Sequence, residues 1–173
     1  MQLNRDDHNL LKVALWSAVL IWAAWVFFLS AQTASESKSL SGQTIRIVAK
    51  MVIPEFEQLP QELQASIVSS WQHIARKTAH ALLYFGLGIL CMTALLQHSL
   101  EMKLRIAIAL GISIGYAIAD EMHQLFVDGR GAQFSDICID AGGALMGVLL
   151  VVMVQGLWGR RSGNRGERER VYE

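Results

Sequence analysis

The chain has 173 residues, 53 % of them hydrophobic, and its 15 lysines and arginines are balanced by 15 acidic residues. That length fits one domain, and a net charge of zero argues against a nucleic-acid-binding surface. The apolar residues fall in long runs with the charges between them, a pattern typical of membrane proteins and not of soluble domains.

Four runs are long enough to cross a bilayer, because about 20 apolar residues span the hydrocarbon core as a helix. They cover residues 13–31, 77–97, 104–126 and 137–158. Backbone polar groups in lipid must bond within their own segment, so each run is predicted to be a helix. We expect an all-α integral membrane bundle over residues 1–158 and a charged, disordered tail over 159–173. The first run could instead be a signal peptide, but it is long for one and lacks a clean cleavage site.

The segment 32–75, between the first two runs, is polar but patterned. Apolar residues recur in it at helical spacing, and Pro54 and Pro60 divide it. It is therefore predicted to form two short amphipathic helices that lie on the membrane or cap the bundle.

The distribution of basic residues predicts the orientation. If the N-terminus is inside, nine of the 15 lysines and arginines fall in cytoplasmic segments, five of them in the tail. Cytoplasmic segments carry the excess of positive charge, so both termini are expected in the cytoplasm. The segment 32–75 and the loop before residue 137 then lie outside.

This topology brings many polar residues to the outer face. They lie in the outer turns of the last three runs and in one loop: Lys77, His80, Tyr84, Asp120, Glu121, His123, Gln124, Arg130, Asp136 and Asp140. Spacings of three and four residues place the first three on one side of their helix. Ionisable groups at membrane depth are costly unless they pair or reach water, so the cluster indicates a site or an ion-pair network.

Several members have a structural interpretation beside the functional one. Lys77 could be an interfacial anchor, and His80 could tie two helices together. Asp120 and Asp140 lie deeper and are the strongest candidates for a site. Arg130 could clamp an anion through its planar guanidinium, or lock a neighbouring aspartate.

Glu121 and His123 face elsewhere. Glu121 lies about 100° around the helix from Asp120 and could pair with Arg130 or Lys77. His123 is expected to be a structural bystander at the level of the head groups.

No cofactor and no metal are expected. A divalent ion held by His80, Asp120, Glu121 and Asp136 is an alternative, but the local sequence Asp120-Glu121-x-His123 lacks a recognised ligand spacing.

Small residues within the runs predict packing roles. Cys91 and Cys138 both lie in apolar runs and are expected to be buried, without a disulfide or a metal. Gly143 and Gly147 form Gly-x-x-x-Gly, which favours close approach of two helices.

Three motifs follow one another over about residues 25–150. They are Phe28-x-Ser30-x-Gln32, then Lys77-x-x-His80-x-x-x-Tyr84-x-x-Leu87-Gly88, then Asp120-Glu121-x-x-Gln124-x-Phe126 with Gly129-Arg130, Asp136 and Gly143. Together they resemble the VanZ-like family of bacterial membrane proteins, although Ala31 stands where a second serine is often seen. That family is named for a protein that gives low-level resistance to teicoplanin. The resemblance implies that the motif residues form one site, and it implies no reaction.

One expected function is a non-catalytic envelope factor of the bacterial cell membrane. It would bind a lipid or antibiotic head group, and its partners would be membrane lipids, a lipid-linked cell-wall precursor or a lipoglycopeptide. The expected ligand-binding residues are Lys77, Tyr84, Gln124, Arg130, Asp136 and Asp140. A homo-oligomer is compatible with this role.

Two alternatives remain open. A membrane-embedded hydrolase or transferase would use His80, Asp120 and Glu121 as catalytic groups on a lipid-linked head group. A small transporter or flippase would need a polar track through the inner half of the spans, and the region around Cys91 and Thr93 offers none.

Overall fold

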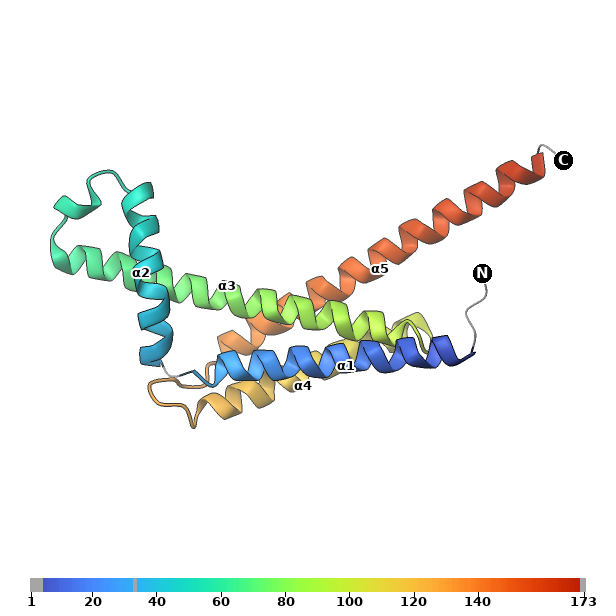
Figure 1. Ribbon diagram of the computed structural model, residues 1–173, viewed down its shortest axis with the longest axis horizontal. Helices are drawn as coiled ribbons and strands as arrows, with labels where there is room; N and C mark the ends of the chain where they lie inside the picture. Colours follow the sequence, from blue (N-terminus) through green and yellow to red (C-terminus); the bar gives the residue numbers. More distant parts are fainter. Residues whose placement is uncertain (1–4, 33, 172–173) are drawn as a thin grey trace.

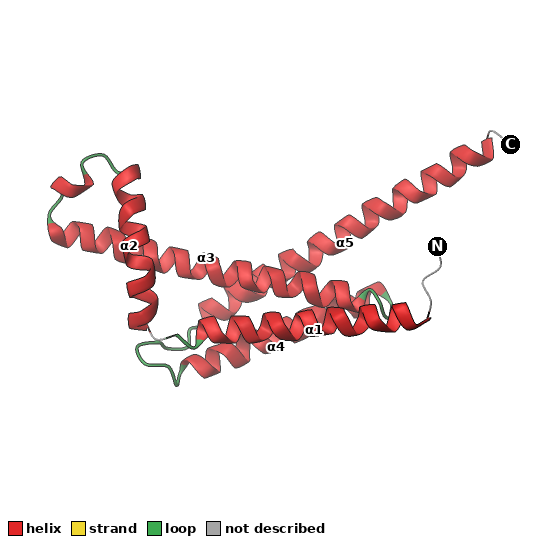
Figure 2. Cartoon of the chain, in the orientation of Figure 1, coloured by secondary structure: helices red, strands yellow, loops and turns green. Residues whose placement is uncertain are grey.

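The computed structural model describes the backbone of residues 5–32 and 34–171, and the side chains of residues 5–32 and 42–158. Its elements are all helical: α1 (Arg5–Ser30), α2 (Ala34–Val52), the 3₁₀ helix η1 (Phe56–Gln58), α3 (Gln61–Leu95), α4 (Met102–Gln124) and α5 (Phe134–Val171) (Figures 1 and 2). Four of them, α1, α3, α4 and α5, are long and apolar enough to cross a membrane. The predicted all-α bundle of four spans is confirmed.

The four long helices alternate in direction. Both ends of the described chain lie at one end of the bundle, whereas α2 and η1 lie at the other (Figure 1). The connection between α4 and α5 lies at the end near α2. The arrangement therefore places both termini on one side of a membrane and the segment between α1 and α3 on the opposite side.

Helix α3 is the central element and contacts α1, α2, α4 and α5. In its most apolar stretch 39 % of the residues are buried, against 17 % in α1 and in α4. Three glycines let the backbones of α3 and α5 touch. A Cβ atom on Gly143 would lie 2.2 Å from the Ala81 carbonyl oxygen, and one on Gly147 would lie 2.2 Å from that of Phe85. On α3, a Cβ on Gly88 would lie 2.3 Å from the Ala144 oxygen. The glycine pair thus has the packing role that Gly-x-x-x-Gly predicts.

The outward surface of the bundle is apolar, as lipid contact requires. Large side chains such as Leu20, Leu82 and Met146 are more than 60 % exposed. An apolar surface of this extent would be unstable in water, and the carboxylates that the spans do contain, Asp120, Glu121 and Asp140, are buried inside the bundle.

The outer segment differs from its prediction in one respect. The breaks occur at the two prolines, because Pro54 follows α2 and Pro60 precedes α3. However, the second amphipathic helix is not separate, since α3 runs unbroken from Gln61 into the membrane. No glycine or proline occurs between Gln61 and Phe85, so nothing interrupts the helix there.

Two further details differ from the sequence predictions. Cys91 is buried as expected, but Cys138 is exposed, because it lies on the outward side of α5. The backbone of α5 continues as helix to Val171, where disorder was predicted. No proline interrupts that tail, although Gly163 and Gly166 each disfavour a helix there.

Candidate functional site

A small polar pocket lies at the end of the bundle near α2, where α3, α4 and α5 meet the α4–α5 loop. Its cavity volume is about 10 Å³, which is room for about one water molecule. Four elements line the pocket: α3 with Arg76, Lys77 and His80, α4 with Gln124, the loop with Arg130, and α5 with Asp136, Ile139 and Asp140. Six of these eight residues belong to the set that the sequence predicted to meet at one membrane face.

The entrance of the pocket carries three basic side chains. Lys77 pairs with Asp136, with 2.6 Å between Nζ and Oδ1. Nη2 of Arg76 lies 3.3 Å from Nδ1 of His73. The half-buried Arg130 follows Gly129, whose φ of 73° makes the turn that brings the arginine to the pocket. Burial, and then the nearby Arg76, lower the pKa of the Arg130 guanidinium.

The floor of the pocket is formed by buried polar groups on α3 and α5. Asp140 is fully buried, and its Oδ2 lies 3.7 Å from Nδ1 of His80. Neither carboxylate oxygen of Asp140 has a hydrogen-bond partner within the described part of the chain. Tyr84, which the sequence predicted to bind the ligand, does not line the pocket, and its fully buried hydroxyl is likewise unpaired among the described residues. Buried polar groups without partners are rare and need a physical explanation.

Behind this floor, α1 and α4 are joined by a hydrogen-bond network. Ser30 Oγ donates to Asp120 Oδ2 over 2.7 Å. Gln124 Nε2 donates to Ser30 Oγ over 3.1 Å and lies 3.5 Å from the same Asp120 oxygen. The other oxygen, Asp120 Oδ1, has no partner among the described residues. The network therefore fixes one side of the Asp120 carboxyl and leaves the other side free.

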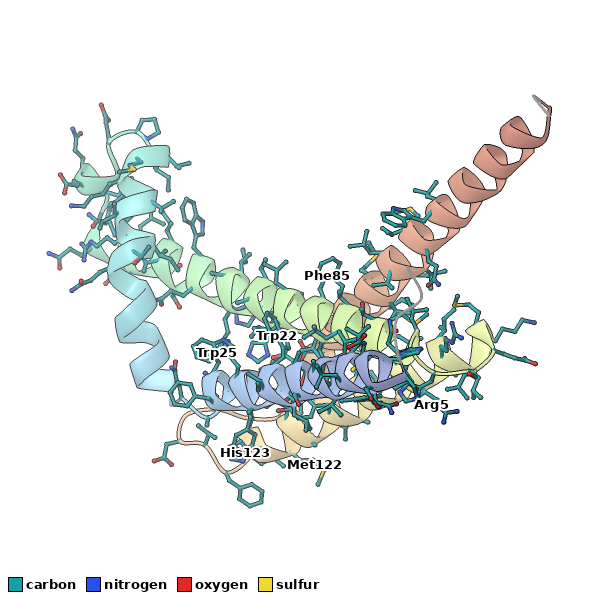
Figure 3. All side chains as sticks on the ribbon, turned by 45° about the vertical axis from the view of Figure 1, so that its right-hand side comes forward. Arg5, Trp22, Trp25, Phe85, Met122 and His123 are labelled. Carbon is teal, nitrogen blue, oxygen red and sulfur yellow. The ribbon has the colours of Figure 1, made fainter. Side chains whose placement is uncertain are left out.

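Glu121 and His123 lie outside this pocket, as their helical positions predicted. Glu121 is buried, but it pairs with neither Arg130 nor Lys77. Instead its Oε2 accepts a 2.8 Å hydrogen bond from the backbone N–H of Gln133, which holds the α4–α5 loop. The ring of His123 stacks on Phe27 with centroids 4.4 Å apart, and Figure 3 shows His123 beside Met122 at the end of α4 far from Arg5.

Three of the buried groups converge from three different helices. His80 on α3, Asp120 on α4 and Asp140 on α5 each place one nitrogen or oxygen atom within 4.8 Å of the other two. The metal set weighed from the sequence contained Glu121 and Asp136 in place of Asp140. Those two residues have other partners in the structure, a backbone N–H and Lys77 respectively.

Sequence reasoning left two contributors out of the site. Ser30 was noted only as part of a motif, although a serine at the end of an otherwise apolar run was a usable signal. Arg76 comes just before the predicted span 77–97 and was not included, although its position beside Lys77 was the signal for it. Both residues lie at about the same level along the bundle as the predicted site residues.

The site thus has two chemical layers. Its entrance holds guanidinium and ammonium groups, which recognise phosphate or carboxylate. Its floor holds an imidazole and buried carboxylates, which can accept protons or bind a cation. The site is therefore suited to a ligand whose anionic group meets the basic entrance and whose hydroxyl, amino or metal-bound atoms meet the floor.

A comparison with protein families gives a match over most of the chain. The model for the family described as VanZ/LLP1 matches residues 15–155. No match was found among curated proteins or among solved structures. With its four membrane-length helices, the chain is a multi-pass membrane protein. It belongs to the VanZ/LLP1 family, as its motifs predicted.

Proposed function

We propose that this protein binds the anionic head group of a lipid, or of a lipid-linked cell-wall precursor, at the outer face of the bacterial plasma membrane. The observation that best supports the proposal is the convergence of Arg76, Lys77 and Arg130 on one pocket at the end of the helical bundle.

The charge at the pocket entrance favours an anion. Asp136 offsets Lys77, whereas no carboxylate in the described residues forms an ion pair with Arg76 or Arg130. The two guanidinium groups are close enough for one to lower the pKa of the other. A phosphate between them would relieve that repulsion and would accept several charge-assisted hydrogen bonds.

The surroundings of the pocket favour a lipid as the source of the anion. Phe126 and Phe134 flank the loop that carries Arg130, and their side chains are 85 % and 79 % exposed. Aromatic side chains of this kind lie in the membrane interface. They would hold the pocket at the depth of the head groups, beside the open lipid surface.

The rest of the bundle favours binding over transport. Between the pocket and the termini, the buried core is built from apolar side chains such as Leu87, Met92, Leu95 and Val148. The buried hydroxyl of Ser113 in this region donates to the carbonyl oxygen of Ala109 in its own helix. A conduit for a charged head group would need polar groups along this path.

The VanZ-like resemblance connects this activity to glycopeptide susceptibility. A protein that holds a precursor head group, or the head group of a lipoglycopeptide, would change how such an antibiotic of the teicoplanin type reaches its target. We include this consequence in the proposal, and it follows only if head-group binding is found.

The proposal is tested by lipid binding to the purified protein. Native mass spectrometry would compare a phosphatidylglycerol and an undecaprenyl phosphate with the zwitterionic phosphatidylethanolamine. We expect the two anionic probes to bind more tightly, and Arg130→Gln to weaken them about tenfold or more, because hydrogen bonds to charged groups contribute about 1.5–3 kcal/mol. The control is Lys103→Gln, which removes an exposed charge at the other end of α4. Equal binding of all three lipids, or equal loss in both variants, contradicts the proposal.

The contact of His80 with Asp140 favours catalysis as the second candidate. The imidazole lines the pocket and lies 3.7 Å from the buried carboxylate, as a general base and its orienting group would. The catalytic groups predicted from the sequence were His80, Asp120 and Glu121, without Asp140. Turnover of an undecaprenyl-linked or phospholipid substrate, lost in His80→Ala and in Asp140→Asn, would replace the binding-only function with a hydrolase or transferase.

A further inference from the structure

We propose that His80, Asp120 and Asp140 together bind one divalent transition-metal ion. The three residues come from α3, α4 and α5, so the ion would lie where these helices meet at the floor of the pocket. The inference goes beyond head-group binding and does not depend on it, because the donor atoms belong to the protein alone.

The placement of the donor atoms supports the site. One atom from each residue lies within 4.8 Å of the other two. Ligand atoms of a tetrahedral ion with bonds of about 2.1 Å lie roughly 3.4 Å apart. His80 Nδ1 and Asp140 Oδ2 are 3.7 Å apart, and no pair is more than 4.8 Å apart, so binding needs two donor atoms to approach by about 1.4 Å at most.

The hydrogen-bond pattern provides an independent reason. Both oxygens of the fully buried Asp140 are unpaired in the described chain, as are Asp120 Oδ1 and His80 Nδ1. Leaving buried donors and acceptors without partners costs about 1–3 kcal/mol each. One ion in contact with these three side chains would give each of them a partner.

Charge favours a cation at this place. Asp120 and Asp140 are both at most 2 % exposed, and among the described residues only the imidazole of His80 comes within ion-pair distance of Asp140. Two carboxylates close together in a low-dielectric region disfavour their ionised forms. A divalent ion offsets both charges and allows both groups to ionise.

The neighbouring groups would also orient the ligands. Ser30 and Gln124 approach only Oδ2 of Asp120, so they hold the carboxyl while Oδ1 stays available. Second partners of this kind are usual for metal ligands.

The donor types indicate the class of ion. Imidazole suits zinc, iron and nickel, and carboxylates suit manganese and magnesium. A mixed set of one nitrogen and two carboxylates therefore favours Mn²⁺ or Zn²⁺ over Ca²⁺. With three protein ligands, the ion would keep open positions on the side of the pocket. These positions would face the space lined by Arg76, Lys77 and Arg130.

Metal binding can be measured on the full-length protein in detergent without any lipid substrate. After treatment with a chelator and dialysis, Mn²⁺ binding would be followed by the loss of the free-ion EPR signal. Zn²⁺ binding would be followed by competition with a chromogenic chelator. We expect about one ion per chain, a raised melting temperature because the ion binds only the folded state, and no comparable effect of Ca²⁺.

Variants identify the ligands. We expect metal binding to weaken by more than about tenfold in each of Asp140→Asn, Asp120→Asn and His80→Gln. Removing a group that only hydrogen-bonds to a metal ligand already costs about tenfold or more, and losing the ligand itself should cost more. Asp136→Asn is the matched control, because it removes the same charge from the same pocket but from a residue paired with Lys77. If Asp140→Asn does not fold, His80→Gln decides, since His80 lies at the partly open side of the site.

Three outcomes would overturn the inference. They are a wild-type protein that binds neither ion, ligand variants that bind as well as the wild type, and an Asp136→Asn variant that loses binding as completely as they do. Arg130→Gln separates the two proposals, because it should lose the anionic lipid and keep the metal.

Discussion

Ser30 Oγ donates a 2.7 Å hydrogen bond to Oδ2 of Asp120, and so joins the last residue of α1 to the last turns of α4. Both groups are buried, and α1 and α4 otherwise share few close contacts. The tyrosine Tyr116 adds a second tie, since its hydroxyl donates to the Ala23 carbonyl oxygen over 2.5 Å. Hydrogen bonds to α4 therefore hold α1 in the bundle, in addition to the packing of its apolar side chains.

Ser30→Ala should destabilise the bundle. The substitution removes the 2.7 Å donor to Asp120 and leaves only the 3.5 Å contact from Gln124. We expect a loss of about 1–2 kcal/mol in the free energy of unfolding, between typical values for hydrogen bonds to charged groups and for those inside membranes. Reversible unfolding in mixed detergent micelles measures it.

Ser113→Ala is the matched control for that experiment. Ser113 is buried too, but its hydroxyl donates to Ala109 in its own helix, and its partner on another helix is the weakly hydrogen-bonding thiol of Cys91, so its loss should be smaller. A double-mutant cycle of Ser30→Ala with Asp120→Asn should be non-additive. Additive effects would show that the two side chains do not interact.

Gly147→Ala should disrupt the contact of α3 with α5. The added Cβ would lie 2.2 Å from the Phe85 carbonyl oxygen, which is backbone and cannot rotate away. We expect a loss of about 1–3 kcal/mol, the usual cost of overpacking, measured as a lower melting temperature in detergent. Gly142→Ala is the control on the same helix, because a Cβ there meets nothing within 4 Å. Equal melting temperatures for the two variants would contradict this account of the helix contact.

Much of the fold could be predicted from the sequence, because the signals are local. Each span is a long apolar run, and each run became a helix, although α1 and α3 begin earlier and α5 ends later than the predicted spans. The largest extension is at the start of α3, which begins at Gln61. That start was misplaced because tryptophan and polar residues before Lys77 look like a surface segment, although nothing in them breaks a helix. Hydropathy alone does not show where a membrane helix continues into water.

The depth of the polar residues was also predictable, but their pairing was not. Helical periodicity places Lys77, Asp120 and Asp136 near one end of the bundle. It does not show that Lys77 contacts Asp136 or that Ser30 contacts Asp120, because these contacts depend on how each helix is rotated against its neighbours. Backbone contact through the glycines of α5 sets part of that rotation. The same rotation turns Cys138 outward.

The ion pair of Lys50 with Glu57 predicts a local pH dependence outside the spans. It joins the end of α2 to η1, and the hydrogen bond and charge of Lys50 lower the pKa of Glu57 below its ordinary value of 4.5. A lowered pKa means that the pair stabilises this turn above pH 4.5 and that the contribution is lost as the pH falls through the lowered value. Lys50→Met should raise the pKa of Glu57.

Carboxyl ¹³C NMR of the protein in micelles measures that titration. Glu62, an exposed glutamate at the start of α3, is the internal reference for the assignment. A Glu57 midpoint that stays in place after Lys50→Met would show that the ion pair does not form in solution.

Cysteine labelling should reveal the orientation of the protein in the membrane. The α4–α5 loop and the C-terminal end of α5 lie at opposite ends of the bundle (Figure 1). In a background of Cys91→Ala and Cys138→Ser, we expect Asp128→Cys to react with an impermeant maleimide in intact cells. Ser162→Cys should react only after the cells are opened, because the arginine-rich tail favours the cytoplasm. The reverse pattern would place the pocket, with Arg130 and Asp140, at the inner face. Its ligand would then have to come from the cytoplasmic leaflet, which would exclude an extracellular antibiotic as a direct partner.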